Sequence, residues 1–275
     1  MTLPRRKAGK AGIDLPTLGL GTYRSFDSLD LDRLGRVLAA AREVGSELVD
    51  TAPVYNRSEA TLAALLRDRD DFFIATKIWD TDPADVEAVF QSQLHAYGRA
   101  SIDLLQVHNL NGWQTNLAWL DRQKAAGRVR FSGVTYQFDN AFEVGGSRTD
   151  LTRIIEHDLV DFVQINLNAA ESDLTGDILP AAAERGIGVL AMRPFGEGKL
   201  LASPPPAERL REFGCTTWTE ALVRWVLTSP QVTTVLAATS NPEHLRANAR
   251  AASAGPLGSA EAAEVSKIAK EIHSS

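Results

Sequence analysis

Residues 47–66 read ELVDTAPVYNRSEATLAALL and contain one complete strand–loop–helix unit. The mostly apolar run Glu47–Asp50 is typical of a short buried strand, and Ser58–Leu66 has the composition of a helix. The loop between them is stiffened by a proline. It places the carboxyl group of Asp50 at the end of the strand and the phenol of Tyr55 five positions later. We therefore expect these two side chains to converge on one pocket.

The same unit recurs along the whole chain. Short apolar runs predict strands at Thr17–Gly21, Glu47–Asp50, Phe72–Lys77, Ile102–Val107, Val129–Val134, Asp161–Ile165, Ile187–Ala191 and Thr233–Leu236. Helices are predicted over residues 31–41, at Ser58–Leu66, from Asp82, at Asn116–Ala126, within Asp150–His157, and at Ile178–Arg185, Thr217–Leu227 and Pro242–Ala251. A last helix is predicted over residues 259–273.

Eight strand–helix units predict an α/β protein whose parallel sheet closes into a (β/α)₈ barrel. The competing architecture is an open, doubly wound sheet, which normally carries a glycine-rich fingerprint after its first strand. The segment Gly19-Leu20-Gly21-Thr22-Tyr23-Arg24 lacks the third glycine of that fingerprint. No linker divides the chain, so we predict a single domain over residues 1–275 that opens with a short segment, residues 1–16.

The composition narrows the classes of partner. The 275 residues are 44% hydrophobic and 23% charged, with a net charge of −6, which argues against nucleic acid and anionic membrane surfaces. Cys215 is the only cysteine, which excludes an intrachain disulfide, and no His, Cys or acid spacing predicts a metal site. Arg5-Arg6 is not followed by an apolar signal region. We expect a cytoplasmic monomer or weak homo-oligomer.

Polar residues at the strand ends predict chemistry at one end of the barrel. Asp50, Lys77 and His108 end or follow three successive strands, and Tyr55 lies in the loop after the first of these. An ammonium group favours ionisation of a neighbouring phenol, and a carboxylate can hold that ammonium group in place. A histidine can orient a carbonyl group or share its proton. Together the four side chains predict a proton-transfer site for a carbonyl or an alcohol.

Their order and spacing resemble the aldo-keto reductase superfamily, in a bacterial-type form with a short C-terminal loop. The motifs that carry the resemblance are Gly19-Leu20-Gly21-Thr22, Asp50-Thr51-Ala52 with Tyr55, Ala75-Thr76-Lys77, Val107-His108-Asn109, Gly133-Val134, Gln164-Ile165-Asn166, Arg193-Pro194-Phe195-Gly196-Glu197-Gly198 and Thr239-Ser240-Asn241-Pro242-Glu243-His244. The resemblance implies hydride transfer between NADP(H) and a carbonyl. It also implies that Tyr55 is the general acid, that Lys77 paired with Asp50 tunes it, and that His108 orients the substrate.

The resemblance further implies which residues contact the cofactor. They are Gly21, Thr22, Tyr23, Asp50, Thr135, Gln164, Met192, Arg193, Pro194, Phe195, Gly196, Gly198, Thr239, Ser240, Asn241, His244 and Asn248. The chain departs from the usual family pattern at Tyr136, at Met192 where a tyrosine normally stacks on the nicotinamide, and at Ala238 and His244 where a lysine and an arginine often hold the 2′-phosphate. We expect NADP(H), with NAD(H) also possible.

The substrate is expected to be a small carbonyl compound. Its predicted pocket consists of Tyr23, Trp79, Asn109, Trp113 and Tyr136, which are largely aromatic and suit a hydrophobic or ring-bearing aldehyde or ketone. Two other functions stay open. One is a barrel relative that uses Tyr55 for a non-redox proton transfer, elimination or cyclisation. The other is a non-catalytic nucleotide-binding subunit.

Overall fold

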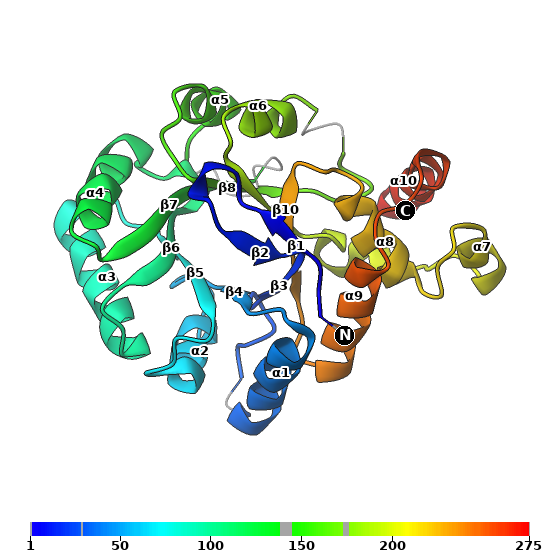
Figure 1. Ribbon diagram of the computed structural model, residues 1–275, viewed down its shortest axis with the longest axis horizontal. Coiled ribbons are helices and arrows are strands. Elements are labelled where there is room, and N and C mark those ends of the chain that lie inside the picture. Colours follow the sequence, from blue (N-terminus) through cyan, green and yellow to red (C-terminus); the bar gives the residue numbers. More distant parts are fainter. Residues whose placement is uncertain (1, 29, 138–144, 173–175, 275) are drawn as a thin grey trace.

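Eight parallel strands form a closed barrel in the computed structural model, which describes residues 2–28, 30–137, 145–172 and 176–274. In barrel order the strands are β10 (Val232–Ala238), β3 (Leu18–Gly21), β4 (Leu48–Asp50), β5 (Phe73–Ile78), β6 (Ile102–Val107), β7 (Val129–Tyr136), β8 (Phe162–Asn166) and β9 (Gly188–Met192), and β9 closes on β10. The predicted (β/α)₈ barrel is therefore confirmed (Figure 1).

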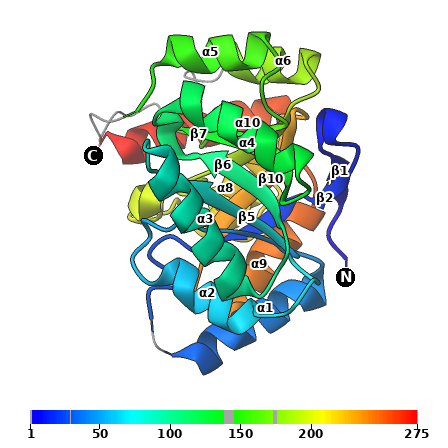
Figure 2. The ribbon, with the colours of Figure 1, turned by 90° about the vertical axis from the view of Figure 1, so that its left-hand side faces the viewer.

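Helices surround the barrel on its outer face (Figures 1 and 2). They are α1 (Leu31–Val44), α2 (Ser58–Leu66), α3 (Pro83–Tyr97), α4 (Trp113–Ala125), α5 (Arg148–Glu156), α6 (Ile178–Glu184), α7 (Ala207–Glu212), α8 (Trp218–Leu227), α9 (Pro242–Ser253) and α10 (Ser259–His273). Local signals set several ends. The side chain of Asp82 caps α3 ahead of a proline in its first turn, and Gly98 ends that helix in the left-handed conformation.

Side chains that point into the barrel fill the amino-terminal part of its interior with apolar atoms. Leu48, Ala75, Leu104, Phe162 and Leu190 belong to one buried cluster, contributed by five different strands. Because successive residues of a strand point to opposite faces, the residue two positions after each of Leu48, Ala75, Leu104, Phe162 and Leu190 also points inward. Those residues are Asp50, Lys77, Gln106, Gln164 and Met192. The interior thus changes from apolar to mostly polar towards the carboxyl ends of the strands.

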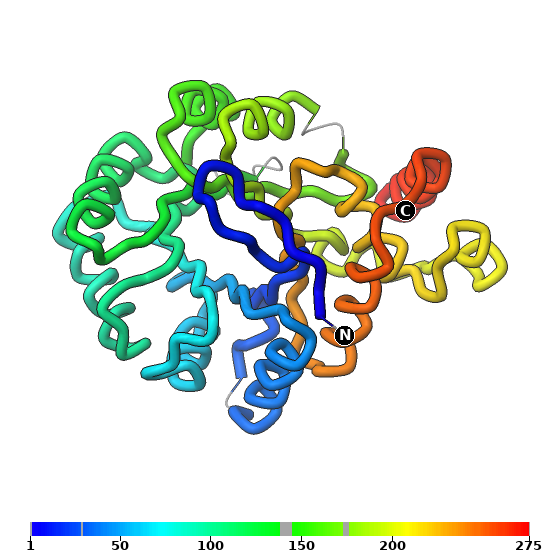
Figure 3. Tube along the Cα trace, viewed as in Figure 1, coloured from blue at the N-terminus to red at the C-terminus, as the bar shows by residue number. Residues whose placement is uncertain are grey.

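A two-stranded antiparallel hairpin covers the opposite end of the barrel. It consists of β1 (Arg5–Lys7) and β2 (Asp14–Pro16). Figure 3 shows it across the centre of the barrel, and Figure 2 shows it at one end of the molecule. Ala8 and Leu15 are buried and belong to the interior apolar cluster. The backbone amide of Lys10 binds the carbonyl of Gly186, which precedes β9. The amino-terminal mouth is therefore plugged.

Several element boundaries differ from the sequence prediction. The hairpin and α7 were not expected, β7 continues two residues beyond Val134, and α4 begins at Trp113 rather than at Asn116. Gly112 precedes α4 with a left-handed backbone and no side-chain cap, so the usual N-cap signal is missing from the sequence. Trp113 is consequently the first residue of α4 and does not belong to the loop between β6 and α4.

Candidate active site

A buried ion pair forms the base of the site. Nζ of Lys77 lies 2.8 Å from Oδ1 of Asp50 and donates to the carbonyl of Thr51 at 2.7 Å. Both side chains are almost wholly buried. Burial pulls the pKa of Lys77 down, but the charges of Asp50 and Tyr55 more than offset this, so the pKa lies above its ordinary value. Lys77 therefore remains an ammonium group at neutral pH.

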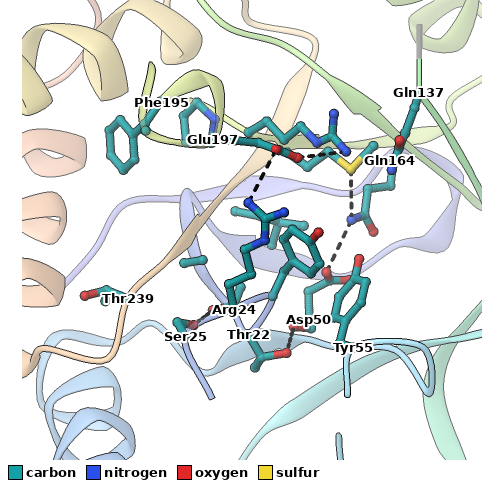
Figure 4. Close-up of a pocket in the computed structure, with 18 of the residues that line it drawn as sticks. Thr22, Arg24, Ser25, Asp50, Tyr55, Gln137, Gln164, Phe195, Glu197 and Thr239 are labelled. Atoms are coloured by element: carbon teal, nitrogen blue, oxygen red, sulfur yellow. Dashed lines mark hydrogen bonds and ion pairs between the residues drawn. The ribbon is translucent and has the colours of Figure 1, made fainter. Parts of the chain in front are cut away.

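Tyr55 lies beside this pair. Its ring centroid is 5.1 Å from Nζ of Lys77, and Figure 4 shows the ring next to the Asp50 carboxylate. Burial raises the pKa of the Tyr55 phenol, Lys77 opposes that rise and Asp50 adds to it. The sequence led us to expect a phenol with a lowered pKa. The ammonium group does act in that direction, but burial outweighs it, so the phenol is protonated at neutral pH.

His108 faces Tyr55 across the site. Their ring centroids are 5.9 Å apart at an interplanar angle of 79°, and Trp79 packs edge-on against the imidazole at 5.1 Å. Burial, together with the charges of Lys77 and Arg193, lowers the pKa of His108 to about 3. The imidazole is therefore neutral at physiological pH. Among the described residues none hydrogen-bonds its Nδ1.

These side chains face a cavity of about 620 Å³ at the carboxyl end of the barrel (Figure 4). The predicted site residues that line it are Gly21, Thr22, Tyr23, Asp50, Tyr55, Trp79, His108, Asn109, Gln164, Met192, Arg193, Pro194, Phe195, Gly198, Thr239 and Ser240. Lys77 and Gly196 are buried outside this lining, as is Asn248 on α9. The structure thus brings three of the four predicted catalytic residues to the cavity wall. The fourth, Lys77, contacts Asp50 from outside the lining.

Two predicted wall residues lie elsewhere. Trp113 and Tyr136 belong to the large hydrophobic core and are each 8% exposed, so neither contributes to the cavity wall. Thr135 also lies outside the lining. Its hydroxyl accepts a 2.9 Å hydrogen bond from the backbone amide of Asn109, a residue with a left-handed backbone (φ 50°). The Thr135 side chain therefore holds the loop after β6 in place.

The amino end of α9 lies at the far side of the cavity. Thr239 and Ser240 line the cavity, whereas the side chain of Asn241 caps the helix by accepting a 2.9 Å hydrogen bond from the amide of Glu243. His244 is exposed on α9, outside the cavity lining. Because one cavity extends from Tyr55 and His108 to this helix end, an elongated ligand with an anionic group fits its shape.

A carboxylate bridges two arginines at the cavity mouth. Glu197 lies 3.0 Å from Arg193 and 3.9 Å from Arg24, as Figure 4 shows for Arg24. All three residues have left-handed backbones, with φ between 55° and 59°, which non-glycine residues seldom adopt. Such strain tends to gather at functional sites.

Eight lining residues were not predicted as site residues. They are Arg24, Ser25, Val54, Gln137, Glu197, Leu201, Leu236 and Ala238. Two signals were present in the sequence. Predicted residues lie close in the sequence to Arg24, Ser25 and Val54. Leu236 occupies a position of its strand at which the alternation of side chains points inward. The long loop after β9 gives no such periodicity, which is why Leu201 was missed.

No group of three or more His, Cys, Asp or Glu side chains within the described residues is arranged to hold a metal ion. Of the described helices, none combines the length and the apolar character that crossing a bilayer requires.

Comparison with known proteins gives a consistent result. The model of the aldo/keto reductase family matches residues 17–270. A D-threo-aldose 1-dehydrogenase from Pseudomonas sp is 28% identical, with 75% of this chain and 74% of that protein covered. A D-galacturonate reductase from Hypocrea jecorina is 25% identical, with coverages of 86% and 82%. The holo form of aldo-keto reductase AKR11C1 from Bacillus halodurans has a TM-score of 0.78 at 20% identity, covering 98% of this chain and 96% of that one.

Proposed function

Because the chain belongs to the aldo/keto reductase family and is therefore an oxidoreductase, we propose that it reduces an aldehyde or ketone to an alcohol with NADP(H). The observation that carries this proposal is the arrangement around Tyr55. A protonated phenol and a neutral imidazole line one cavity, and the charged Lys77–Asp50 pair lies beside the phenol. In that arrangement the phenol can donate a proton to a carbonyl oxygen, while the imidazole beside it stays neutral.

In the proposed reaction each side chain has one task. The Tyr55 phenol donates a proton to the carbonyl oxygen as negative charge develops there. Lys77 stabilises the phenolate that remains, and Asp50 holds the ammonium group close to Tyr55. The neutral His108 hydrogen-bonds the carbonyl oxygen and orients it towards the phenol.

The cavity also fits a nicotinamide dinucleotide, which when bound supplies the hydride. Gln164 and Met192 line the part of the cavity near Asp50, and Thr239 and Ser240 line the part near α9. Gln164 would hold the nicotinamide carboxamide, and the amino end of α9 would hold a phosphate group. We propose NADP(H) as the preferred form, on the family resemblance. NAD(H) is the alternative because Ala238 and the exposed His244 supply no fixed cation at the adenosine end.

Nucleotide titration tests the proposal directly. Adding NADPH or NADH to the purified protein should quench its tryptophan fluorescence at micromolar concentrations, since Trp79 lines the cavity. Tighter binding of NADPH supports the phosphorylated cofactor, and tighter binding of NADH reverses that choice. Binding of neither nucleotide would sink the proposed reduction and leave a non-redox proton transfer as the remaining role for Tyr55.

The variant Tyr55→Phe tests the assignment of the acid. It should lower kcat for a generic aldehyde by at least about 100-fold, the usual range for general acid catalysis, and should leave the nucleotide Kd nearly unchanged. Tyr97→Phe is the matched control, because Tyr97 is fully buried on α3 and lies outside the cavity lining. Equal kcat values for Tyr55→Phe and the wild type would mean that another group is the acid.

The cavity mouth indicates the class of carbonyl compound. Tyr23, Val54 and Leu201 are exposed hydrophobic residues that line it, with Phe195 and Trp79 further along the wall. We propose an apolar or ring-bearing aldehyde or ketone. The names of two relatives refer to sugar-type substrates, D-threo-aldose and D-galacturonate. A comparison of kcat/KM for benzaldehyde with that for an aldose discriminates the two classes.

We also propose that the protein acts in the cytoplasm as a monomer or weak homo-oligomer. Its single cysteine, Cys215, is buried and cannot form an intrachain disulfide. Light scattering over a range of protein concentrations would measure the oligomeric state, and fractionation of the native host would locate the protein.

A further inference from the structure

Three polar side chains from alternate strands meet inside the barrel at the base of the cavity. Asp50 comes from β4, Gln106 from β6 and Gln164 from β8, and each is at most 4% exposed. Alternate strands of such a barrel contribute to one layer of interior side chains. Asp50 and Gln164 line the cavity, whereas Gln106 does not. Gln106 therefore has no place in the proposed chemistry, although it is a fully buried amide.

Hydrogen bonds fix the orientation of the three side chains. The Asp50 carboxylate can only accept, so the Gln164 amide group must turn its NH₂ towards it, at 3.3 Å. The carbonyl oxygen Oε1 of Gln164 then faces Gln106, whose Nε2 donates to it at 2.8 Å. Gln164 is thus held from both sides, by an acceptor and by a donor.

We propose that Gln106 is a positioning residue that fixes the orientation of the Gln164 carboxamide and thereby the hydrogen-bonding group that Gln164 presents to the nicotinamide. The inference rests on the proposed function, in which Gln164 meets the cofactor carboxamide. Nε2 of Gln164 also lies 3.6 Å from Sδ of Met192, a weak acceptor for the second hydrogen of the NH₂ group. A carbonyl oxygen of the cofactor is the stronger acceptor for that hydrogen.

A second effect of Gln106 concerns Asp50. Burial raises the pKa of the Asp50 carboxyl, Lys77 lowers it, and hydrogen bonding from Gln164 and from Gln106 lowers it further. Gln106 thus supports the charged state of the carboxylate that holds Lys77. It does so at a cost, because its own Oε1 is buried with no hydrogen-bond partner among the described residues. An unpartnered buried acceptor is unfavourable, which argues that the amide is there for its donor.

Two substitutions separate positioning from packing. Gln106→Met keeps the length of the side chain and removes the donor. We expect the Kd for NADPH to rise and kcat to fall by about 2- to 10-fold each, the effect of one hydrogen bond. Gln106→Glu keeps the shape. A protonated carboxyl group donates to Gln164 as the amide does, whereas an ionised one cannot, so kcat should approach the wild-type value at low pH and fall as the pH rises.

Gln123→Met is the matched control, since Gln123 is a buried amide on α4 that accepts from Arg128, outside the cavity lining. It should leave kcat, Kd and the pH profile unchanged. Wild-type values of kcat, Kd and the pH profile in both Gln106 variants would overturn the inference, even if their thermal stability fell. Failure of the wild-type protein to bind NADPH or NADH would overturn the proposed function and this inference together. The wild-type titration therefore distinguishes the two failures.

Discussion

Lys77 is the residue on which the charge balance of the site depends. It is buried beside one carboxylate and one phenol, and it contributes electrostatically to the pKa shifts of Tyr55 and His108. A buried charge of this kind is tolerated only while it is paired, because the loss of one partner leaves the other without compensation. The same pair thus links the stability of the barrel to the proton transfer proposed for Tyr55.

Replacement of Lys77 by methionine should therefore affect both properties. We expect the variant to lose nearly all activity, because the Tyr55 phenolate loses its stabilising charge, and to be destabilised by about 3 kcal/mol, because Asp50 is left buried and unpaired. Chemical denaturation measures the free energy of unfolding. The double variant Lys77→Met/Asp50→Asn should recover most of the stability and none of the activity. If the double variant is no more stable than Lys77→Met, the loss of stability comes from packing and not from the unpaired charge.

At the scale of elements, a second polar group lies outside the barrel wall between α2, α3 and β5. The carboxyl of Glu59 accepts hydrogen bonds from Thr76 and, at 3.2 Å, from Gln93, whose amide also donates to the carbonyl of Lys77 at 3.0 Å. Burial raises the pKa of Glu59 to about 7, against the opposing hydrogen bonds. The two helices thus enclose a carboxyl group that titrates near neutral pH.

The raised pKa predicts a pH-dependent stability. Between pH 4.5 and 7 the folded protein retains a proton that the unfolded chain has lost, so stability falls as the pH rises through this window. Glu59→Gln removes this term and keeps the shape. The difference in the free energy of unfolding between the variant and the wild type should increase by about 3 kcal/mol from pH 4.5 to pH 8, in favour of the variant. Denaturation curves at several pH values measure this gain, and Glu184→Gln, at an exposed position of α6, should show none.

Elements differed in how well the sequence predicted them. The barrel strands were predictable because each is an apolar run with helical periodicity on either side, as at β5 and β8. The hairpin was not, because β1 has the sequence Arg-Arg-Lys and is stabilised by contacts with distant parts of the chain. The four residues predicted as catalytic could be chosen because strand ends meet in a barrel. Arg24 and Glu197 were not chosen, although each adjoins residues that were, because nothing in the sequence shows that these two distant side chains pair at the cavity mouth.

At the scale of the whole molecule, the hairpin and the proposed active site lie at opposite ends of the barrel. Arg6 donates to the carbonyls of Leu227 and Val232 at 2.8 Å and 2.7 Å, and to that of Ser229 at 3.0 Å. These bonds fasten the hairpin to the segment between α8 and β10, at the end remote from Tyr55. Changes at the hairpin should therefore alter stability without altering the chemistry.

Arg6→Met tests this separation. The loss of three hydrogen bonds from a charged donor should cost about 3 kcal/mol of unfolding free energy and change kcat and the nucleotide Kd by less than about 2-fold. Thermal denaturation and steady-state kinetics measure the two effects. Lys7→Met, at an exposed position of the same strand, is the control and should change neither. A large change in kcat for Arg6→Met would contradict the separation of the two ends.

The plugged amino-terminal mouth has a further consequence for the supply of protons. Ala8 and Leu15 place buried apolar side chains at that end, whereas the cavity that Tyr55 lines lies at the carboxyl end of the barrel. If Tyr55 donates its proton in each turnover, we expect the replacement proton to enter through the same opening by which the product leaves. Reprotonation of Tyr55 would then follow release of the alcohol product.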